Sequence, residues 1–187
     1  NALILARFAV MSQAAGLVPI IEPEVLMDGD HTIETCQNVT EMVGQMVFEA
    51  LEEQRVDFVG MLYKPNMVVA GKDCPKQPGI GEVAKKTVET MNKLVSVRVP
   101  GITFLSGGQD AKIATARLNG IAKIGAGASW RWTFSFERAL EGPAMEVWAG
   151  KEENREVAQK TLVHRAKMNH LASLGQYNKE EDILYEI

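Results

Sequence analysis

Residues 101–124 run from an apolar segment, Gly101-Ile-Thr-Phe-Leu105, through a turn, Ser106-Gly-Gly-Gln-Asp110, into a helical pattern over Ala111–Ile124. The first segment is apolar at successive positions, which favours a strand that is buried on both faces of a parallel sheet. Two glycines and a helix-capping residue type follow it. The stretch therefore predicts a buried strand, a tight turn and a helix, the unit from which α/β folds are built.

The same unit recurs along the chain. Helical periodicity is found over Thr32–Gln54 and Glu82–Val95, a helix opens the chain from Ala2, and an extra helix is expected over Glu153–Leu174. Three more short runs are expected to be strands: Leu17–Ile21, Phe58–Leu62 and Trp130–Phe134. This alternation implies a parallel sheet with right-handed crossovers, either an open doubly wound sheet or a barrel. A complete (β/α)₈ barrel needs about 250 residues, so these units fit half of one.

Composition excludes several classes of protein. The 187 residues are 46% hydrophobic and 24% charged, which is ordinary for a globular domain and excludes disorder and low complexity. No apolar run approaches the roughly 18 residues of a membrane-spanning helix, and no secretory leader opens the chain. We therefore expect a cytoplasmic protein without a membrane segment.

The charge balance and the cysteines exclude further classes of protein. A net charge of −4 is the wrong balance for a general nucleic-acid binder, so any anionic ligand must be held by a local pocket. Cys36 and Cys74 are too few for a disulfide framework and lack zinc-site spacing, so both are expected to be free thiols. No linker divides the chain, and it begins at Asn1 inside an apparent helix, which suggests part of one longer domain.

Polar residues follow the predicted strands. Glu22 and Glu24 follow the first, Lys64 the second, Ser106-Gly107-Gly108 the third and Arg138 the fourth. In a parallel barrel the carboxyl ends of the strands open on one mouth. We therefore expect these side chains to converge.

Lys64 is a candidate nucleophile. It follows a largely apolar run, and an amine in such surroundings can form a Schiff base with a carbonyl substrate once it has lost its proton. A carboxylate such as Glu22 can shuttle protons beside it. The alternatives are a strand-end lysine that reaches solvent and a pair of solvated loop acids, Glu22 and Glu24.

The turn after the third strand is a candidate anion site. Its glycines let the backbone approach an anion, and the following helix offers free N–H groups unless Asp110 caps it. Arg138 could bind phosphate oxygens in bidentate fashion or belong to a surface ion pair. His31, His164 and His170 lack the spacing of metal ligands, and Trp130 and Trp132 share one strand face, which favours packing.

Four blocks of the sequence carry a family resemblance. They are Leu17–His31, Leu62-Tyr-Lys-Pro-Asn-Met-Val68, Gly101-Ile-Thr-Phe-Leu-Ser-Gly-Gly-Gln109 and Thr133-Phe-Ser-Phe-Glu-Arg-Ala-Leu140. In order and spacing they resemble the class I fructose-bisphosphate aldolases. The resemblance runs from Asn1 to about Tyr177 and implies a TIM (β/α)₈ barrel. This chain, residues 1–187, would supply about its last four βα units and the C-terminal helices, as the C-terminal half of a single domain.

The resemblance also implies roles for individual residues. Lys64 is similar to the family's Schiff-base lysine, Glu22 to its general acid/base and Glu24 to a supporting glutamate near the site. The residues implied to hold or adjoin one substrate phosphate are Ser106, Gly107, Gly108 and Arg138. The implied reaction is the reversible cleavage of fructose 1,6-bisphosphate to dihydroxyacetone phosphate and glyceraldehyde 3-phosphate in glycolysis and gluconeogenesis.

The implied reaction needs no metal or other cofactor. The implied partners are a phosphorylated sugar, the missing N-terminal half of the barrel and further copies in a homotetramer, with no nucleic acid and no membrane. Two alternatives stay open: another Schiff-base lyase or transaldolase on the same barrel, and a non-catalytic aldolase-like scaffold.

The chain also departs from the family pattern. Glu137 stands where the family usually has a glycine beside the phosphate, and Tyr63 replaces an aliphatic residue next to Lys64. The role of the family's C-terminal tyrosine is not transferred to Tyr185. The residues that the family places on its first four strands, including a second phosphate site, are absent from this sequence.

Overall fold

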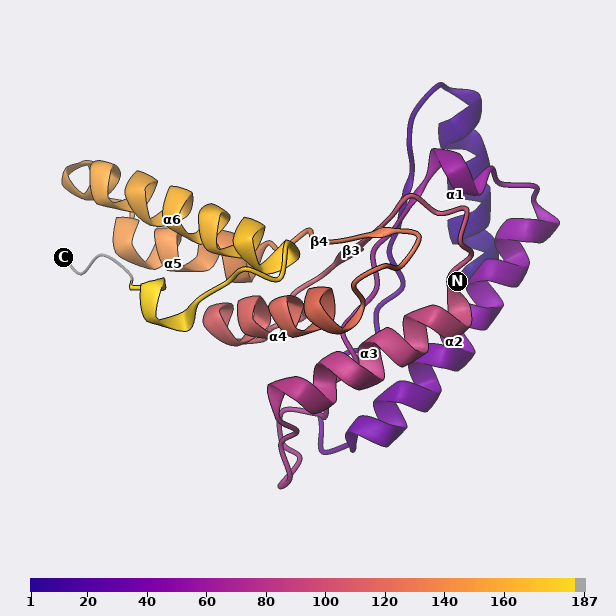
Figure 1. The fold of residues 1–187 in the computed structure, drawn as a ribbon. Coiled ribbons are helices and arrows are strands. Elements are labelled where there is room, and N and C mark those ends of the chain that lie inside the picture. Colours follow the sequence, from indigo (N-terminus) through magenta and orange to yellow (C-terminus); the bar gives the residue numbers. More distant parts are fainter. Residues whose placement is uncertain (184–187) are drawn as a thin grey trace.

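The computed structural model describes residues 1–183, so Tyr185 lies outside the described residues. Helices and strands alternate over most of this length (Figure 1). The strands are β1 (Ile20–Ile21), β2 (Leu62–Tyr63), β3 (Gly101–Phe104) and β4 (Arg131–Phe134). The helices are α1 (Ala2–Ala14), α2 (Ile33–Glu53), α3 (Ile80–Leu94), α4 (Ala111–Ile124), α5 (Arg138–Trp148) and α6 (Arg155–Ser173).

The strands form one parallel sheet in the order β1-β2-β3-β4. Ile21 pairs with Tyr63, Tyr63 with Ile102, and β3 pairs with β4 along its whole length. Each strand therefore lies beside the next one in the sequence, without the reversal of order that marks a doubly wound sheet. The prediction of an α/β fold with a parallel sheet is confirmed.

The helices pack against one another in nearly the same sequential order. Contacts join α1 to α2, α2 to α3, and α3 to α4, while α6 lies against both α4 and α5. Figure 1 shows α2, α3 and α4 one after another, from right to left, below the labelled strands β3 and β4. In residues 1–183 we find no helix that combines the length and the apolar character needed to cross a bilayer.

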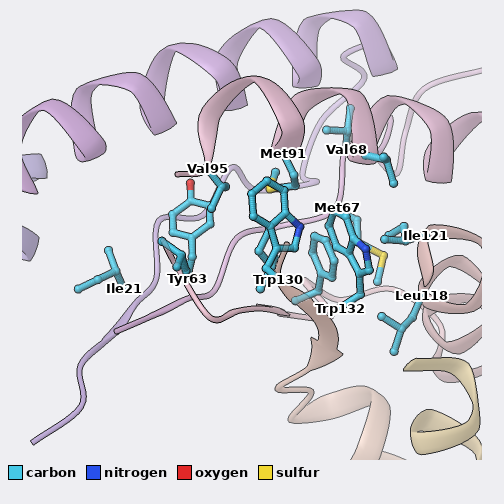
Figure 2. Close-up of a cluster of buried hydrophobic side chains, with 14 of the residues drawn as sticks. Ile21, Tyr63, Met67, Val68, Met91, Val95, Leu118, Ile121, Trp130 and Trp132 are labelled. Carbon is cyan, nitrogen blue, oxygen red and sulfur yellow. The ribbon is translucent and has the colours of Figure 1, made fainter. Parts of the chain in front are cut away.

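The core lies between the strands and the inner faces of α3 and α4. Figure 2 shows Met91 and Val95 from the α3 side and Leu118 and Ile121 from α4 gathered around side chains of the sheet. The two tryptophans lie among them with ring centroids 5.8 Å apart and nearly perpendicular planes, as predicted for packing residues. Burial of such apolar surface is worth about 25 cal/mol per Å² and is the main term that stabilises the fold.

Two predicted strands differ from the observed ones. Residues 58–60 form a 3₁₀ turn instead of the start of a strand, because the Asp57 carboxylate accepts a hydrogen bond from the Val59 N–H at 3.2 Å. Strand β2 accordingly begins only at Leu62. Of the predicted strand Leu17–Ile21, only Ile20 and Ile21 pair with a neighbour.

A buried polar network holds the C-terminal segment against the helices. The Arg165 guanidinium, fully buried on α6, donates to both carboxylate oxygens of Asp182 at 3.0 and 2.7 Å. Tyr177 Oη donates to Asp182 at 2.9 Å, and Nε2 of His164 lies 3.0 Å from it. His164 is therefore part of this structural network.

Candidate active site

Backbone hydrogen bonds align the segments that leave the sheet. Lys64 N–H donates to the Ile21 carbonyl at 2.8 Å, Leu105 N–H to the Pro65 carbonyl at 3.1 Å, and Ser135 N–H to the Phe104 carbonyl at 2.8 Å. The parallel pairing thus continues just past the ends of the strands. It fixes the relative positions of the polar residues that follow each of them.

Lys64 and Glu22 lie side by side. Because Ile21 pairs with Tyr63, the next residue on each strand falls at neighbouring positions. Lys64 Nζ lies 2.9 Å from Glu22 Oε1, with 18% of the lysine side chain and 45% of the glutamate side chain exposed. A mostly buried amine next to a partly solvated carboxylate can pass a proton to it and so become a nucleophile.

Asn66 is a site-supporting residue that the sequence analysis missed. Its buried amide accepts a hydrogen bond from the Val25 N–H at 3.0 Å and donates to Thr40 Oγ1 and the Met67 carbonyl, both at 3.1 Å. These bonds tie the segment after Lys64 to the segment after Glu22 and to α2. An amide directly after a Lys-Pro pair, within an otherwise apolar stretch, was the available signal.

The turn after β3 presents unused hydrogen-bond donors. Gly107 and Gly108 have φ values of +58° and +80°, a backbone conformation that favours glycine. Within residues 1–183 neither their N–H groups nor the Ser106 hydroxyl makes a hydrogen bond. The donors at the start of α4 are taken, because Asp110 accepts from Lys112 N–H and Ile113 N–H at 3.0 Å each. Asp110 is therefore the helix cap that the sequence allowed as an alternative.

Oppositely charged side chains flank this turn. A Cβ built on Gly108 would lie 3.2 Å from Nη1 of Arg138, and one built on Gly107 would lie 3.6 Å from Oε1 of Glu24. Arg138 is exposed and makes no hydrogen bond or ion pair with another described residue. Its helix, α5, begins at Arg138 itself, and the N-cap residue Glu137 makes no side-chain capping bond. A free guanidinium, uncapped helix N–H groups and free loop N–H groups are the donors that bind phosphate.

The loop before α2 also approaches this region. Asp28 forms an ion pair with Lys72. The hydrogen bond and charge of Lys72, together with the more remote charge of Arg138, hold the pKa of Asp28 below its usual value. The pKa of Asp28 is therefore set mainly by its partner Lys72.

The structure thus brings the predicted residues together in two groups. Lys64 pairs with Glu22, and the turn Ser106–Gly108 lies between Arg138 and Glu24. In the part of the chain that the structure describes, no cluster of His, Cys, Asp and Glu could hold a metal ion. Both cysteines are free and buried.

Three comparisons with known proteins found similar sequences and structures. The family model "Glycolytic: Fructose-bisphosphate aldolase class-I" matches residues 1–185. Fructose-bisphosphate aldolase 2 of Caenorhabditis elegans is 48% identical over 97% of this chain and 50% of its own length. Fructose-bisphosphate aldolase B of Gallus gallus is 48% identical over 95% of this chain and 49% of its own.

A solved structure is also similar. Fructose-bisphosphate aldolase from Plasmodium falciparum, in complex with TRAP and a small-molecule inhibitor, has a TM-score of 0.92 and 44% identity. The match covers 95% of this chain and 51% of that one. The chain therefore spans about half the length of the relatives that it matches.

Proposed function

Since the chain belongs to the class I fructose-bisphosphate aldolase family, we propose that the protein containing it is a lyase that reversibly cleaves fructose 1,6-bisphosphate through a Schiff base. The products would be dihydroxyacetone phosphate and glyceraldehyde 3-phosphate. The observation that carries the proposal is the 2.9 Å contact between Lys64 Nζ and Glu22 Oε1.

This contact supports a proton-transfer route for imine formation. The amine becomes nucleophilic when it passes a proton to Glu22 or to water. The amine then adds to the ketose carbonyl, and Glu22 returns a proton to the carbinolamine hydroxyl, which leaves as water. The resulting iminium takes up the electron pair of the breaking carbon–carbon bond, while a base removes the proton of the hydroxyl on the departing carbon.

One phosphate of the substrate would bind at the turn after β3. The donors there that have no partner in the described part of the chain are the Ser106 hydroxyl, the N–H groups of Gly107 and Gly108, and the Arg138 guanidinium. Glu24 lies beside the same turn and carries the wrong charge to bind phosphate. We therefore assign Glu24 the role of tuning phosphate affinity.

Residues 1–187 would form the C-terminal half of one TIM barrel, with the last four βα units and the helices that follow them. The strand order and the coverage of half of each relative support this assignment. Large apolar side chains also lie exposed near the unpaired edge of β1. Leu17, Val18, Ile20 and, on α1, Ile4 and Phe8 are each at least 44% exposed. The missing N-terminal half would cover such an edge, which is otherwise prone to aggregation.

The remaining expectations concern the cellular setting. A glycolytic family and two unpaired cysteines support a cytoplasmic location. A homotetramer is expected from the family resemblance. Light scattering coupled to size exclusion on the full-length protein measures the number of subunits.

Borohydride trapping tests the proposal. The full-length protein is treated with borohydride in the presence of dihydroxyacetone phosphate. We expect the reduced triose to be attached to Lys64, which peptide mass mapping locates. Lys64→Met is the control and should show no adduct. The absence of an adduct on Lys64 in the unaltered protein would overturn the proposal.

Kinetics separate the alternatives. Preferential cleavage of the bisphosphate supports the aldolase. Equal cleavage of the monophosphate, or transfer of a three-carbon unit to another aldose, supports another Schiff-base enzyme. A correctly folded full-length protein that never cleaves either sugar supports the non-catalytic scaffold.

A further inference from the structure

Arg117 is a buried cation without a counter-charge among residues 1–183. It lies on α4 with 8% of its surface exposed, and its Nε atom is buried without a hydrogen-bond partner among the described residues. No carboxylate of residues 1–183 forms an ion pair with it. Burial also lowers the pKa of its guanidinium. A buried charge is costly unless something compensates it.

Arg165, in the same molecule, is a buried arginine whose charge is compensated. Its guanidinium is also buried, and it has the Asp182 carboxylate and backbone and side-chain oxygens as partners. Arg117 lacks such a set. Its side chain is directed elsewhere, toward the turn that leads into its own helix.

Gln109 connects Arg117 to the candidate phosphate turn. Arg117 Nη1 donates to Gln109 Oε1 at 2.7 Å, and Gln109 N–H donates to the Ser106 carbonyl at 3.1 Å. Helical side chains lean toward the N-terminus of their helix, which explains how a residue eight positions along the chain reaches Gln109. The guanidinium thus lies behind the turn whose N–H groups and hydroxyl are free.

We propose that Arg117 is an affinity-determining residue for the substrate phosphate, whose negative charge at Ser106–Gly108 compensates the buried guanidinium. The residue does not touch the phosphate. Its field acts through a low-dielectric part of the protein, where charges interact more strongly than in water, and its bond to Gln109 holds the turn. The inference rests on the proposed function, because that function places a phosphate at this turn.

Four variants of the full-length protein test the proposal, with inorganic phosphate as the probe and its dissociation constant measured by ³¹P NMR titration. Arg138→Gln first identifies the binding that belongs to this turn. Arg117→Gln is expected to weaken that binding about three- to tenfold, and Arg117→Lys to restore most of it. Gln109→Glu keeps an acceptor for Arg117, but the new carboxylate neutralises the charge of the guanidinium. It should therefore weaken phosphate binding at least as much as Arg117→Gln.

Arg131→Gln is the matched control. It removes one exposed positive charge at the opposite end of β4 and should leave the dissociation constant within a factor of two. Borohydride trapping with uncharged dihydroxyacetone should label Lys64 equally in the unaltered protein and in Arg117→Gln. That readout reports the Schiff-base chemistry without the phosphate.

Each result has a distinct meaning. Unchanged phosphate affinity in Arg117→Gln, tighter binding in Gln109→Glu, or no phosphate binding that depends on Arg138 would each overturn the inference. If no adduct forms on Lys64 in the unaltered protein, the proposed function would instead be overturned. Phosphate binding that depends on Arg117 would then still support the role of the buried charge.

Discussion

The Lys64 ammonium and the Glu22 carboxylate form an ion pair of 2.9 Å across the ends of two adjacent parallel strands. The contact follows from the pairing of Ile21 with Tyr63, which places the next residue of each strand at neighbouring positions. The pair therefore depends on the sheet register and not on loop conformation. A rigid origin of this kind suits a proton transfer, which requires a fixed distance.

Substitution of Glu22 tests this geometry. Glu22→Gln keeps the size of the side chain but cannot accept the proton from Lys64, so we expect kcat to fall about 10²- to 10⁴-fold with a much smaller change in KM. Single-turnover formation of the trapped Lys64 adduct should slow in parallel. Glu49→Gln, an exposed change on α2, is the control and should leave both rates unchanged. A normal rate of adduct formation in Glu22→Gln would remove Glu22 from the mechanism.

Gly108 offers a test of the phosphate turn. Gly108→Ala adds a methyl group 3.2 Å from Nη1 of Arg138 and strains a backbone with φ +80°. We expect phosphate binding to weaken at least fivefold because Arg138 is displaced, with a loss of stability of about 1 kcal/mol. Gly127→Ala matches the strain at φ +90° with no atom within 4 Å of the new methyl group. It should lose similar stability and keep its affinity for phosphate; equal affinities in the two variants would contradict the assignment.

Glu24 should weaken the binding of phosphate at the turn after β3. Its carboxylate lies beside Gly107, so Glu24→Gln is expected to tighten binding of inorganic phosphate about two- to fivefold at low ionic strength. The gain should shrink in high salt, because the glutamate is exposed. A titration at two salt concentrations measures both effects. Weaker binding in Glu24→Gln would show that the carboxylate instead organises the donors of the turn.

The sequence predicted the bounds of α2, α3, α4 and α6 to within two residues, because helices depend on local periodicity. No bounds were predicted for α5. The periodicity also left an open doubly wound sheet and a barrel as alternatives, because the order of strands in a sheet is set by contacts between distant segments. Thr32 and Gln54, the bounds predicted for one helix, are the caps of α2 in the structure. The start of β2 was missed because the side chain of Asp57 competes with strand pairing, and short apolar runs do not reveal such competition. Glu22 and Lys64 directly follow β1 and β2, while Ser106 and Arg138 lie two and four residues beyond β3 and β4.

Periodicity and motifs do not reveal which groups form hydrogen bonds with each other in the folded chain. Asn66 joins segments that are distant in the sequence, and Arg117 reaches back to Gln109 in the turn before its own helix. Turns between a strand and a helix are often glycine-rich for steric reasons. Only the structure showed that Asp110 takes the donors of α4 while, among residues 1–183, those of Gly107 and Gly108 stay free. Satisfied and unsatisfied donors are a property of three-dimensional neighbours.

Asp182 is expected to control the stability of the C-terminal region. Burial acts to raise the pKa of its carboxyl group, but the hydrogen bonds and charge of Arg165, with the bonds from Tyr177 and His164, outweigh burial and hold the pKa below its usual value. A carboxyl group of this kind stabilises the fold above its unfolded-state pKa of about 3.9, and this contribution is lost as the pH falls toward the lower folded-state value.

Asp182→Asn should therefore lower the free energy of unfolding by about 3–5 kcal/mol at pH 7, because it leaves the buried Arg165 without a counter-charge. Thermal melts of the unaltered protein and the variant measure the difference, which should narrow as the pH drops below about 4. Tyr177→Phe removes one hydrogen bond to Asp182 but keeps the ion pair. Its cost should be smaller, about 1–3 kcal/mol. If the difference in the free energy of unfolding between the unaltered protein and Asp182→Asn stays constant down to pH 3, the ionised carboxylate is not what stabilises this segment.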